Sequence, residues 1–166
     1  LRLPLLIRSP FHKVKGESIT PIVLNIDLAS TIVDLAGAAA PSSFQGRSLK
    51  PLLEKNPPAD WRKDFLYEYF YERNFRNPTI LAVRTEKSKL VTYPGREHWN
   101  ELFDISGDSY ELTNLHAYPD SEPLRKQLEG RLEELKKETG YKIPANNDPD
   151  NFGNEKPAGP RRKAKN

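Results

Sequence analysis

The sequence predicts an α/β protein whose second half has α+β character, and three observations support this prediction. An apolar run near the N-terminus, Leu3–Ile7, is typical of a strand buried on both faces of a parallel sheet. Four strand-like runs with short links follow a proline-rich linker, and they favour an antiparallel sheet. A leucine-striped helix comes next, and its stripe can cover one face of that sheet.

Residues 1–55 are predicted to form the end of a larger α/β sheet. A parallel-type strand such as Leu3–Ile7 needs neighbouring strands, and the rest of the sequence offers none for it. The chain also begins at Leu1 rather than at Met, with apolar residues from the start. We therefore expect the chain to be part of a larger protein, with an N-terminal portion that precedes Leu1.

A helix is expected after the first apolar run, within residues 22–36. Apolar side chains recur there every three or four residues. Asp27 and Ser30 are both candidate N-caps, because their side-chain oxygens can accept hydrogen bonds from free backbone N–H groups. Gly37 suits the position just beyond the helix, where a left-handed backbone conformation is common.

Residues 56–143 are predicted to form a separate subdomain, made of an antiparallel sheet and one helix. The linker Asn56–Asp60 separates it from the first segment. The strand-like runs cover residues 65–70, 79–84, 89–93 and 99–105. A short polar link joins the second and third runs, which indicates a hairpin. The leucine stripe of the helix comprises Leu124, Leu128, Leu132 and Leu135.

The remaining residues, 144–166, are predicted to be a disordered basic tail, because the segment is rich in Asn, Asp, Pro, Gly and Lys. The formal net charge of the chain is +3. Residues 146–166 hold five Lys or Arg and three Asp or Glu, so the rest of the chain carries only +1. Nucleic-acid binding needs a basic face on the folded part, and none is expected here.

Composition excludes several further classes of protein and of functional site. No apolar run approaches the roughly 18 residues that a membrane span needs. The chain has no cysteine, so it has no disulfide framework, no thiolate zinc site and no thiol nucleophile. Its three histidines lie far apart, without metal-ligand spacing. Asp104, Asp108 and Glu111 surround a turn, but a Ca²⁺ loop needs denser oxygen ligands, so no metal site is predicted.

Three residues are candidates for binding a ligand, and each also has an ordinary structural explanation. Glu68 stands between two tyrosines and is either a ligand-binding acid or a solvent-facing or paired residue. Arg84 ends a strand whose neighbour carries Lys89, and such a cationic pair either holds an anion or forms a charged wet face. His98 precedes Trp99 in a loop, and it is either a sugar contact or a surface histidine.

Five blocks of the sequence, in order, resemble type I sulfatases of the alkaline phosphatase superfamily. The block LRLPLLIRSP resembles the family's LRVPLIIRWP, DLASTIVDLAG resembles DLAPTILDLAG, and QGRSLKPLL resembles QGRSLLPLL. AVRTEKSKL resembles AVRTERYKLI, and ELFDI with YELTNL resembles ELYDLENDPYELNNL. The blocks cover residues 1 to about 116, and they are most similar to bacterial glycan sulfatases of the heparan or N-sulfoglucosamine sulfohydrolase type.

The resemblance implies a large N-terminal α/β domain and a smaller C-terminal subdomain with a four-stranded antiparallel sheet and a helix. Residues 1–55 would then be the last strand and helix of the alkaline-phosphatase-like sheet, and residues 56–143 the subdomain. It also implies sulfate-ester hydrolysis by a formylglycine, made from Cys or Ser in a C/S-x-P-x-R motif, beside Ca²⁺. Both groups are expected in the N-terminal portion. Ser121–Arg125 fits the motif's spacing but opens the last helix, so we reject it as the nucleophile.

We therefore expect the C-terminal part of a sulfatase that acts on a sulfated glycan. The expected partners are the N-terminal sulfatase domain and a sulfated carbohydrate, with no nucleic acid and no membrane span. Glu68, Arg84 and His98 are the predicted wall residues of the substrate pocket, and no catalytic residue, metal or cofactor is assigned to this chain. We expect it to be inactive alone.

Two alternatives stay open from the sequence. One is another hydrolase of the alkaline phosphatase superfamily, such as a phosphodiesterase or phosphonate hydrolase. The other is a non-catalytic binding module. The resemblance also implies a periplasmic or secreted protein.

Overall fold

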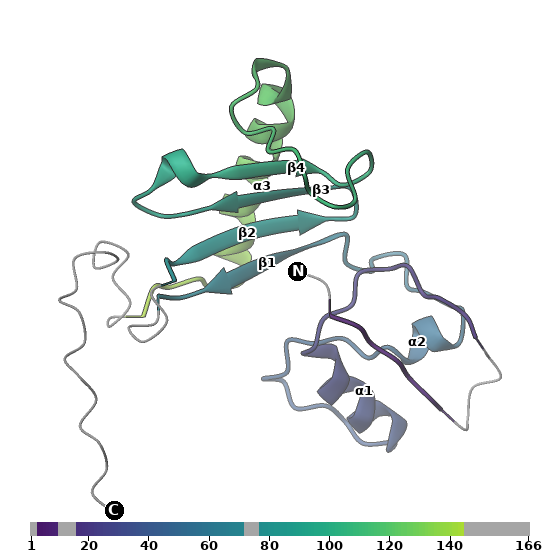
Figure 1. Ribbon diagram of the computed structural model, residues 1–166. Coiled ribbons are helices and arrows are strands. Elements are labelled where there is room, and N and C mark those ends of the chain that lie inside the picture. Colours follow the sequence, from purple (N-terminus) through teal and green to yellow (C-terminus); the bar gives the residue numbers. More distant parts are fainter. Residues whose placement is uncertain (1–2, 10–15, 72–76, 145–166) are drawn as a thin grey trace, which may run out of the picture. The chain divides into compact units, whose positions relative to one another are not determined.

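A computed structural model of the chain describes residues 3–9, 16–71 and 77–144, and the chain divides into two compact units (Figure 1). The first unit ends at Lys63 and the second begins at Asp64. Residues 56–63, which the sequence assigns to the second segment, contribute Trp61 and Arg62 to the first unit. The predicted tail lies outside the described residues from position 145 onward.

The first unit contains two helices, α1 (Asp27–Leu35) and α2 (Lys50–Leu53), around a small core of Leu49, Leu52 and Trp61. The predicted helix is present, but it begins later than expected. Its N-cap position is Ile26, and no side chain caps it. Gly37 follows the helix with φ of +71°, in the left-handed conformation predicted for it.

The two predicted N-caps of α1 have other roles. The Asp27 carboxylate accepts hydrogen bonds from the backbone N–H groups of Leu24 and Arg47, each at 2.8 Å. The Ser30 hydroxyl donates to the carbonyl of Gly46 at 2.9 Å. A Cβ atom on Gly46 would overlap the backbone oxygen of Ile26, so the chain beyond the helix approaches the start of α1 as closely as glycine allows. Tertiary hydrogen bonds therefore fix the start of α1.

The buried side of α1 is polar. Asp27, Ser30 and Thr31 are its buried residues, whereas the apolar residues Ile26, Leu28, Ile32 and Leu35 are exposed. The recurrence of apolar side chains predicted the helix itself, and it assigned no packed face to it. The buried side of α1 instead makes hydrogen bonds to the segment that follows the helix, which leaves apolar side chains of the helix exposed.

Residues 3–9 form neither a strand nor a helix, so the predicted strand at Leu3–Ile7 is absent from this structure. Its side chains are exposed, with Leu3 at 83% and Leu6 at 96%. The physical reason is that a strand is stabilised by hydrogen bonds to a neighbouring strand. No strand among the described residues pairs with this run.

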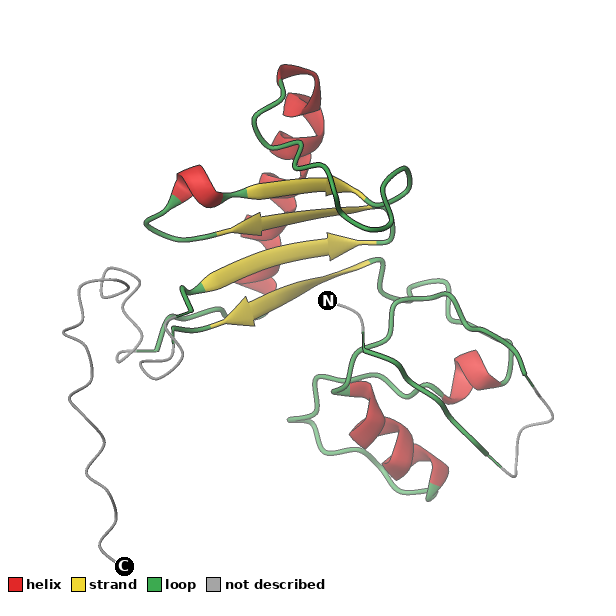
Figure 2. Cartoon of the chain, in the orientation of Figure 1, coloured by secondary structure: helices red, strands yellow, loops and turns green. Residues whose placement is uncertain are grey.

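The second unit is the predicted antiparallel sheet and helix. Its strands are β1 (Asp64–Tyr69), β2 (Ile80–Thr85), β3 (Ser88–Thr92) and β4 (Glu101–Asp104). They pair in the order β1-β2-β3-β4, each antiparallel to its neighbour. Figures 1 and 2 show the long helix α3 (Glu122–Glu138) crossing one face of the sheet.

The core of this unit lies between α3 and the sheet. Side chains alternate along each strand, and one set faces the helix. The buried cluster joins Leu81, Val83, Leu90 and Leu102 from the strands to Leu128, Leu132 and Leu135 from α3. The predicted leucine stripe and its place against the sheet are confirmed. Trp99, predicted in the last strand, instead ends the 3₁₀ helix η1 (Glu97–Trp99) that precedes β4.

Candidate functional site

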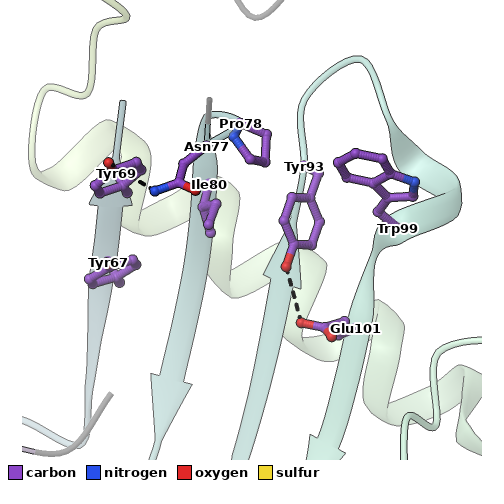
Figure 3. A pocket seen from close by; sticks show the side chains of 8 residues that line it. All are labelled: Tyr67, Tyr69, Asn77, Pro78, Ile80, Tyr93, Trp99 and Glu101. Atoms are coloured by element: carbon purple, nitrogen blue, oxygen red, sulfur yellow. Dashed lines mark hydrogen bonds between the residues drawn. The ribbon is translucent and has the colours of Figure 1, made fainter. Parts of the chain in front are cut away.

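The face of the sheet opposite α3 carries a pocket of about 590 Å³, and we call this side of the sheet the open face (Figure 3). The aromatic residues that line the pocket are Tyr67, Tyr69, Tyr93 and Trp99. The other lining residues are Asn77, Pro78, Ile80 and Glu101. All four strands or the turns beside them therefore contribute to one concave surface within the second unit.

The register of the strands places lining residues from β1 and β4 in one row. Tyr67 pairs with Ala82, Ala82 with Val91, and Val91 with Glu101, so these four residues form one row across the open face. Ala82 and Val91 in the middle of the row are small and buried, whereas the outer residues are long. Tyr67 and Glu101, at the two ends of the row, line the pocket, whereas Ala82 and Val91 are not among the residues that line it.

Two hydrogen bonds position polar groups in the pocket. The Tyr93 hydroxyl donates to Oε2 of Glu101 at 3.2 Å, and Nδ2 of Asn77 donates to the Tyr69 hydroxyl at 3.3 Å (Figure 3). Burial raises the pKa of Tyr93, and the charge and hydrogen bond of Glu101 add to that increase. The rings of Tyr93 and Trp99 meet edge to face with centroids 5.9 Å apart, a favoured aromatic geometry.

The three predicted binding residues do not come together. Glu68 pairs with Leu81 in the register, so it points to the α3 side of the sheet, where burial raises the pKa of its carboxyl. Arg84 is on the open face, and its guanidinium donates to the carbonyl oxygens of Thr85 and Ser88. His98 lies in η1, exposed. None of the three lines the pocket, and their role in binding stays a prediction.

The predicted cationic pair is present, but each cation has partners of its own. Arg84 and Lys89 are directly opposite each other on the open face. Lys89 is only 7% exposed, forms an ion pair with Glu111, and lies 4.8 Å above the centroid of the Phe103 ring. Its positive charge is therefore matched within the unit rather than directed into the pocket.

Sequence reasoning missed most of the pocket. Tyr67 and Tyr69 were identified as the neighbours of Glu68, and strand alternation already placed them on the opposite face from it. Tyr93 and Glu101 join them only through the pairing of β1 with β2, β2 with β3 and β3 with β4. Predicting the pocket requires the register of all four strands. A predicted hairpin gives the register of only one strand pair, β2 with β3.

Residues with metal-ligand chemistry are scattered. Among the described residues, no group of three or more His, Cys, Asp or Glu is arranged to hold a metal ion. The Ser121–Arg125 stretch starts α3, with Ser121 at the N-cap position, and Arg125 donates to the carbonyl of His116 at 3.0 Å. Over the ranges that the structure describes, no helix is both long and apolar enough to span a bilayer.

Comparisons with known proteins identify relatives that match most of this chain. Residues 1–138 match the family described as N-sulphoglucosamine sulphohydrolase, C-terminal. An N-acetylglucosamine-6-O-sulfatase of Bacteroides thetaiotaomicron is 37% identical over 153 residues, which are 90% of this chain and 26% of that protein. The human N-acetylglucosamine-6-sulfatase is 40% identical in an alignment of 156 residues that covers 76% of this chain and 28% of that protein.

Solved structures agree with these relatives, and they include BT4656 in complex with its substrate D-glucosamine-2-N,6-O-disulfate. That structure has a TM-score of 0.62 and 35% identity, over 75% of this chain and 25% of that one. A phosphonate monoester hydrolase from Silicibacter pomeroyi has a TM-score of 0.67 and 25% identity, over 79% of this chain and 28% of that one. The chain thus spans about a quarter of the length of its relatives. It belongs to the N-sulphoglucosamine sulphohydrolase C-terminal family, and so to the C-terminal portion of the type I sulfatases.

Proposed function

We propose that this chain is the C-terminal part of a hydrolase that releases sulfate from a sulfated glycan. The observation that carries the proposal is the match of residues 1–138 to the C-terminal family of a sulphohydrolase. The names of the relatives support a glucosamine-based substrate, since they include N-acetylglucosamine-6-sulfatases and a protein solved with a disulfated glucosamine. A periplasmic or secreted location is part of the same proposal.

Within that hydrolase, residues 1–55 would complete the α/β catalytic domain and residues 56–143 would form the C-terminal subdomain. The exposed apolar side chains of the first unit support this division. Leu3, Leu6 and Ile32 are 83%, 96% and 68% exposed, and apolar surface of this kind usually marks a contact with another part of a protein. In this proposal, the N-terminal sulfatase domain is the part of the protein that contacts these exposed apolar side chains.

The role of this chain would be to bind and position the glycan rather than to cleave the ester. The pocket on the open face provides rings, an amide and a carboxylate for that purpose. Glu68, Arg84 and His98 remain further candidates for the substrate wall. The formylglycine and Ca²⁺ implied by the family are expected in the N-terminal portion, and no bond-breaking step is assigned to residues of this chain.

A second candidate function is phosphonate monoester hydrolysis. It is favoured by the TM-score of 0.67 to the phosphonate monoester hydrolase of Silicibacter pomeroyi. Both reactions hydrolyse an anionic ester on the same kind of fold. The fold alone therefore does not distinguish the two functions.

The test replaces the matching quarter of the Bacteroides thetaiotaomicron N-acetylglucosamine-6-O-sulfatase with this chain. After circular dichroism shows that the chimera folds, we expect it to release sulfate from N-acetylglucosamine 6-sulfate. The chain alone should release none. A folded chimera that cleaves a phosphonate monoester but no sulfate ester would support the second candidate. Sulfate release by the chain alone would contradict the division of labour proposed here.

A further inference from the structure

The chain passes from the first unit to the second between Lys63 and Asp64, and an arginine–carboxylate pair lies on each side of Lys63. We call these pairs, Arg62–Asp27 in the first unit and Asp64–Arg131 in the second, the flanking ion pairs. We infer that Lys63 is a single-residue joint, so that the two units change their relative orientation by rotation about this one point of the chain. The inference rests on contacts within each unit, and it is independent of the proposed function.

On the side of the first unit, the chain is held up to Arg62. The Trp61 side chain belongs to the core of that unit, and its Nε1 donates to the carbonyl of Ile22 at 2.9 Å. The Arg62 side chain is 13% exposed, and both of its terminal nitrogens donate to the fully buried carboxylate of Asp27. Bidentate pairs of this kind are geometrically specific as well as strong. The first unit therefore restrains the residue directly before Lys63.

The ring of Trp61 restrains the same stretch a second time. The guanidinium carbons of Arg47 and Arg62 lie 4.8 and 5.3 Å from the centroid of this ring, within the range of a cation–π contact. Arg47 also donates to the backbone carbonyl of Asp60 at 2.7 Å. Main chain, ring and guanidinium groups are thus packed together, and residues 60–62 are held as a part of the first unit.

On the side of the second unit, the chain is held from Asp64 onward. Asp64 opens β1 and is paired with Thr85 of β2. The end of an edge strand frays easily, but the Asp64 carboxylate accepts hydrogen bonds from Nε and Nη2 of Arg131 in α3, at 2.7 and 3.0 Å. The second unit therefore restrains the residue directly after Lys63.

Lys63 is the one residue that lies between the two restrained positions. It is exposed and forms a bend, so its backbone angles can change without the loss of a buried contact. Hinges in proteins are a few such residues, which absorb the φ/ψ change between rigid parts. The Cα atoms of Arg62 and Asp64 can be at most about 7 Å apart, because each residue spans no more than about 3.6 Å. The units can therefore rotate about the joint but cannot separate.

The test measures how far the joint limits the arrangement of the units. The chain has no cysteine, so Ala29→Cys in α1 and Lys137→Cys in α3 place one spin label on each unit, both at exposed positions. Double electron–electron resonance on the full 166-residue chain, diluted with unlabelled chain, gives the distribution of distances between the labels. A Gly-Ser-Gly-Ser insertion after Lys63 adds about 10–12 Å of root-mean-square reach and should broaden the distribution clearly.

A substitution at the joint itself leaves both flanking ion pairs in place. Lys63→Gly gives the backbone more freedom, so we expect a distribution at least about 1.5-fold wider than that of the parent chain. Ala39→Gly is the matched control, because Ala39 lies in an exposed loop within the first unit. It should leave the width unchanged.

A second pair of variants tests the flanking ion pair of the second unit. Asp64→Asn keeps the size of the side chain but removes the charge that pairs with Arg131, so the start of β1 should fray and the distribution should widen. Asp60→Asn makes the same chemical change at a side chain that is 80% exposed. It should leave the width unchanged, because Trp61 and Arg62 are still held. Circular dichroism verifies that each variant is folded.

Three results would overturn the inference. A parent distribution as wide as that of the insertion variant would mean that the free segment is longer than one residue. A narrow distribution in every variant, Lys63→Gly included, would mean that direct packing of the units sets their arrangement. Equal widening in Asp60→Asn and Asp64→Asn would place the start of the free segment before Arg62. Sulfate release by the chimera decides the proposed function separately from all three.

Discussion

At the scale of single residues, Asp27 connects more of the first unit than any neighbouring side chain. Its carboxylate is fully buried and accepts hydrogen bonds from two backbone N–H groups, of Leu24 and Arg47. Both guanidinium nitrogens of Arg62 also donate to it, one of them at 2.7 Å. A buried carboxylate is tolerated when its acceptor positions are filled in this way, and bidentate pairing with arginine is the strongest form.

Asp27→Ala is therefore expected to destabilise the first unit by about 3–5 kcal/mol, because it removes the carboxylate that pairs with the largely buried Arg62 guanidinium and accepts from two backbone N–H groups. Urea unfolding followed by Trp61 fluorescence, in a Trp99→Phe background, measures the change. Asp60→Ala is the matched control, since the Asp60 side chain is 80% exposed and its ion pair with Arg47 should contribute less than about 1 kcal/mol. Equal losses in both variants would contradict the assignment.

The hydrogen bond between Tyr93 and Glu101 predicts a pH dependence. The pKa of Tyr93 is raised from 10.0, first by burial and then by the charge and hydrogen bond of Glu101. A raised pKa means that the neutral phenol is favoured in the folded protein. Its contribution to stability is therefore fully present below pH 10 and is lost as the pH rises through the folded pKa.

Ultraviolet titration of the tyrosines measures this effect, with Tyr93→Phe identifying the contribution of that residue. In Glu101→Gln, the midpoint of Tyr93 should move down towards the ordinary value, because the negative charge of Glu101 is removed while burial remains. An unchanged midpoint would mean that burial alone sets the pKa.

At the scale of elements, α3 and the sheet pack against each other as two layers. Leu128 is 2% exposed and lies in the cluster between the helix and the strands. Arg131 joins the same helix to the first strand, because its Nε and Nη2 donate to the Asp64 carboxylate at 2.7 and 3.0 Å. Apolar packing and a bidentate ion pair therefore fix the position of the helix.

Leu128→Ala should lower the free energy of unfolding of the second unit by about 3 kcal/mol, through lost burial and the cavity left behind. Denaturant unfolding followed by far-ultraviolet circular dichroism tests this value. Leu112→Ala is the control with the same chemical change, and it should have almost no effect because the Leu112 side chain is exposed in the loop between β4 and α3. A similar loss for both leucines would place Leu128 outside the core.

The elements also show which parts of the fold could be predicted from the sequence. The sheet, its antiparallel order and the leucine-striped helix follow from local periodicity, and all were confirmed. The start of α1 and the strand at Leu3–Ile7 were wrong, because both depend on partners distant in sequence. Asp27 carries the signature of an N-cap, yet its carboxylate is used by Arg62 and Arg47. The pocket was missed for a related reason, since it requires the register of four strands.

At the scale of the whole molecule, the two units differ in the surface they present. The second unit buries its leucines between sheet and helix, whereas the first leaves Leu3, Leu6 and the apolar side of α1 exposed. Exposed apolar side chains favour association. The first unit therefore has the surface expected of a part that is completed by another domain.

Leu6→Lys should have opposite effects in two contexts. In the isolated chain it should reduce self-association, measured by light scattering, because it interrupts an exposed apolar run. In the chimera with the Bacteroides thetaiotaomicron sulfatase it should reduce folding and sulfate release, because the same position would be covered. Tyr110→Lys, at a position that is 84% exposed in the second unit, should change neither measurement. Improvement in both contexts would contradict the proposed contact.

The contact between Gly46 and the start of α1 has a consequence for natural variation. Because any Cβ there would overlap the carbonyl of Ile26, this position is closed to the other nineteen amino acids unless the backbone moves. Phe44, two residues earlier, is exposed, so substitutions at that position meet no such steric limit. A homologue without glycine at this position should therefore be read as one in which α1 has been displaced.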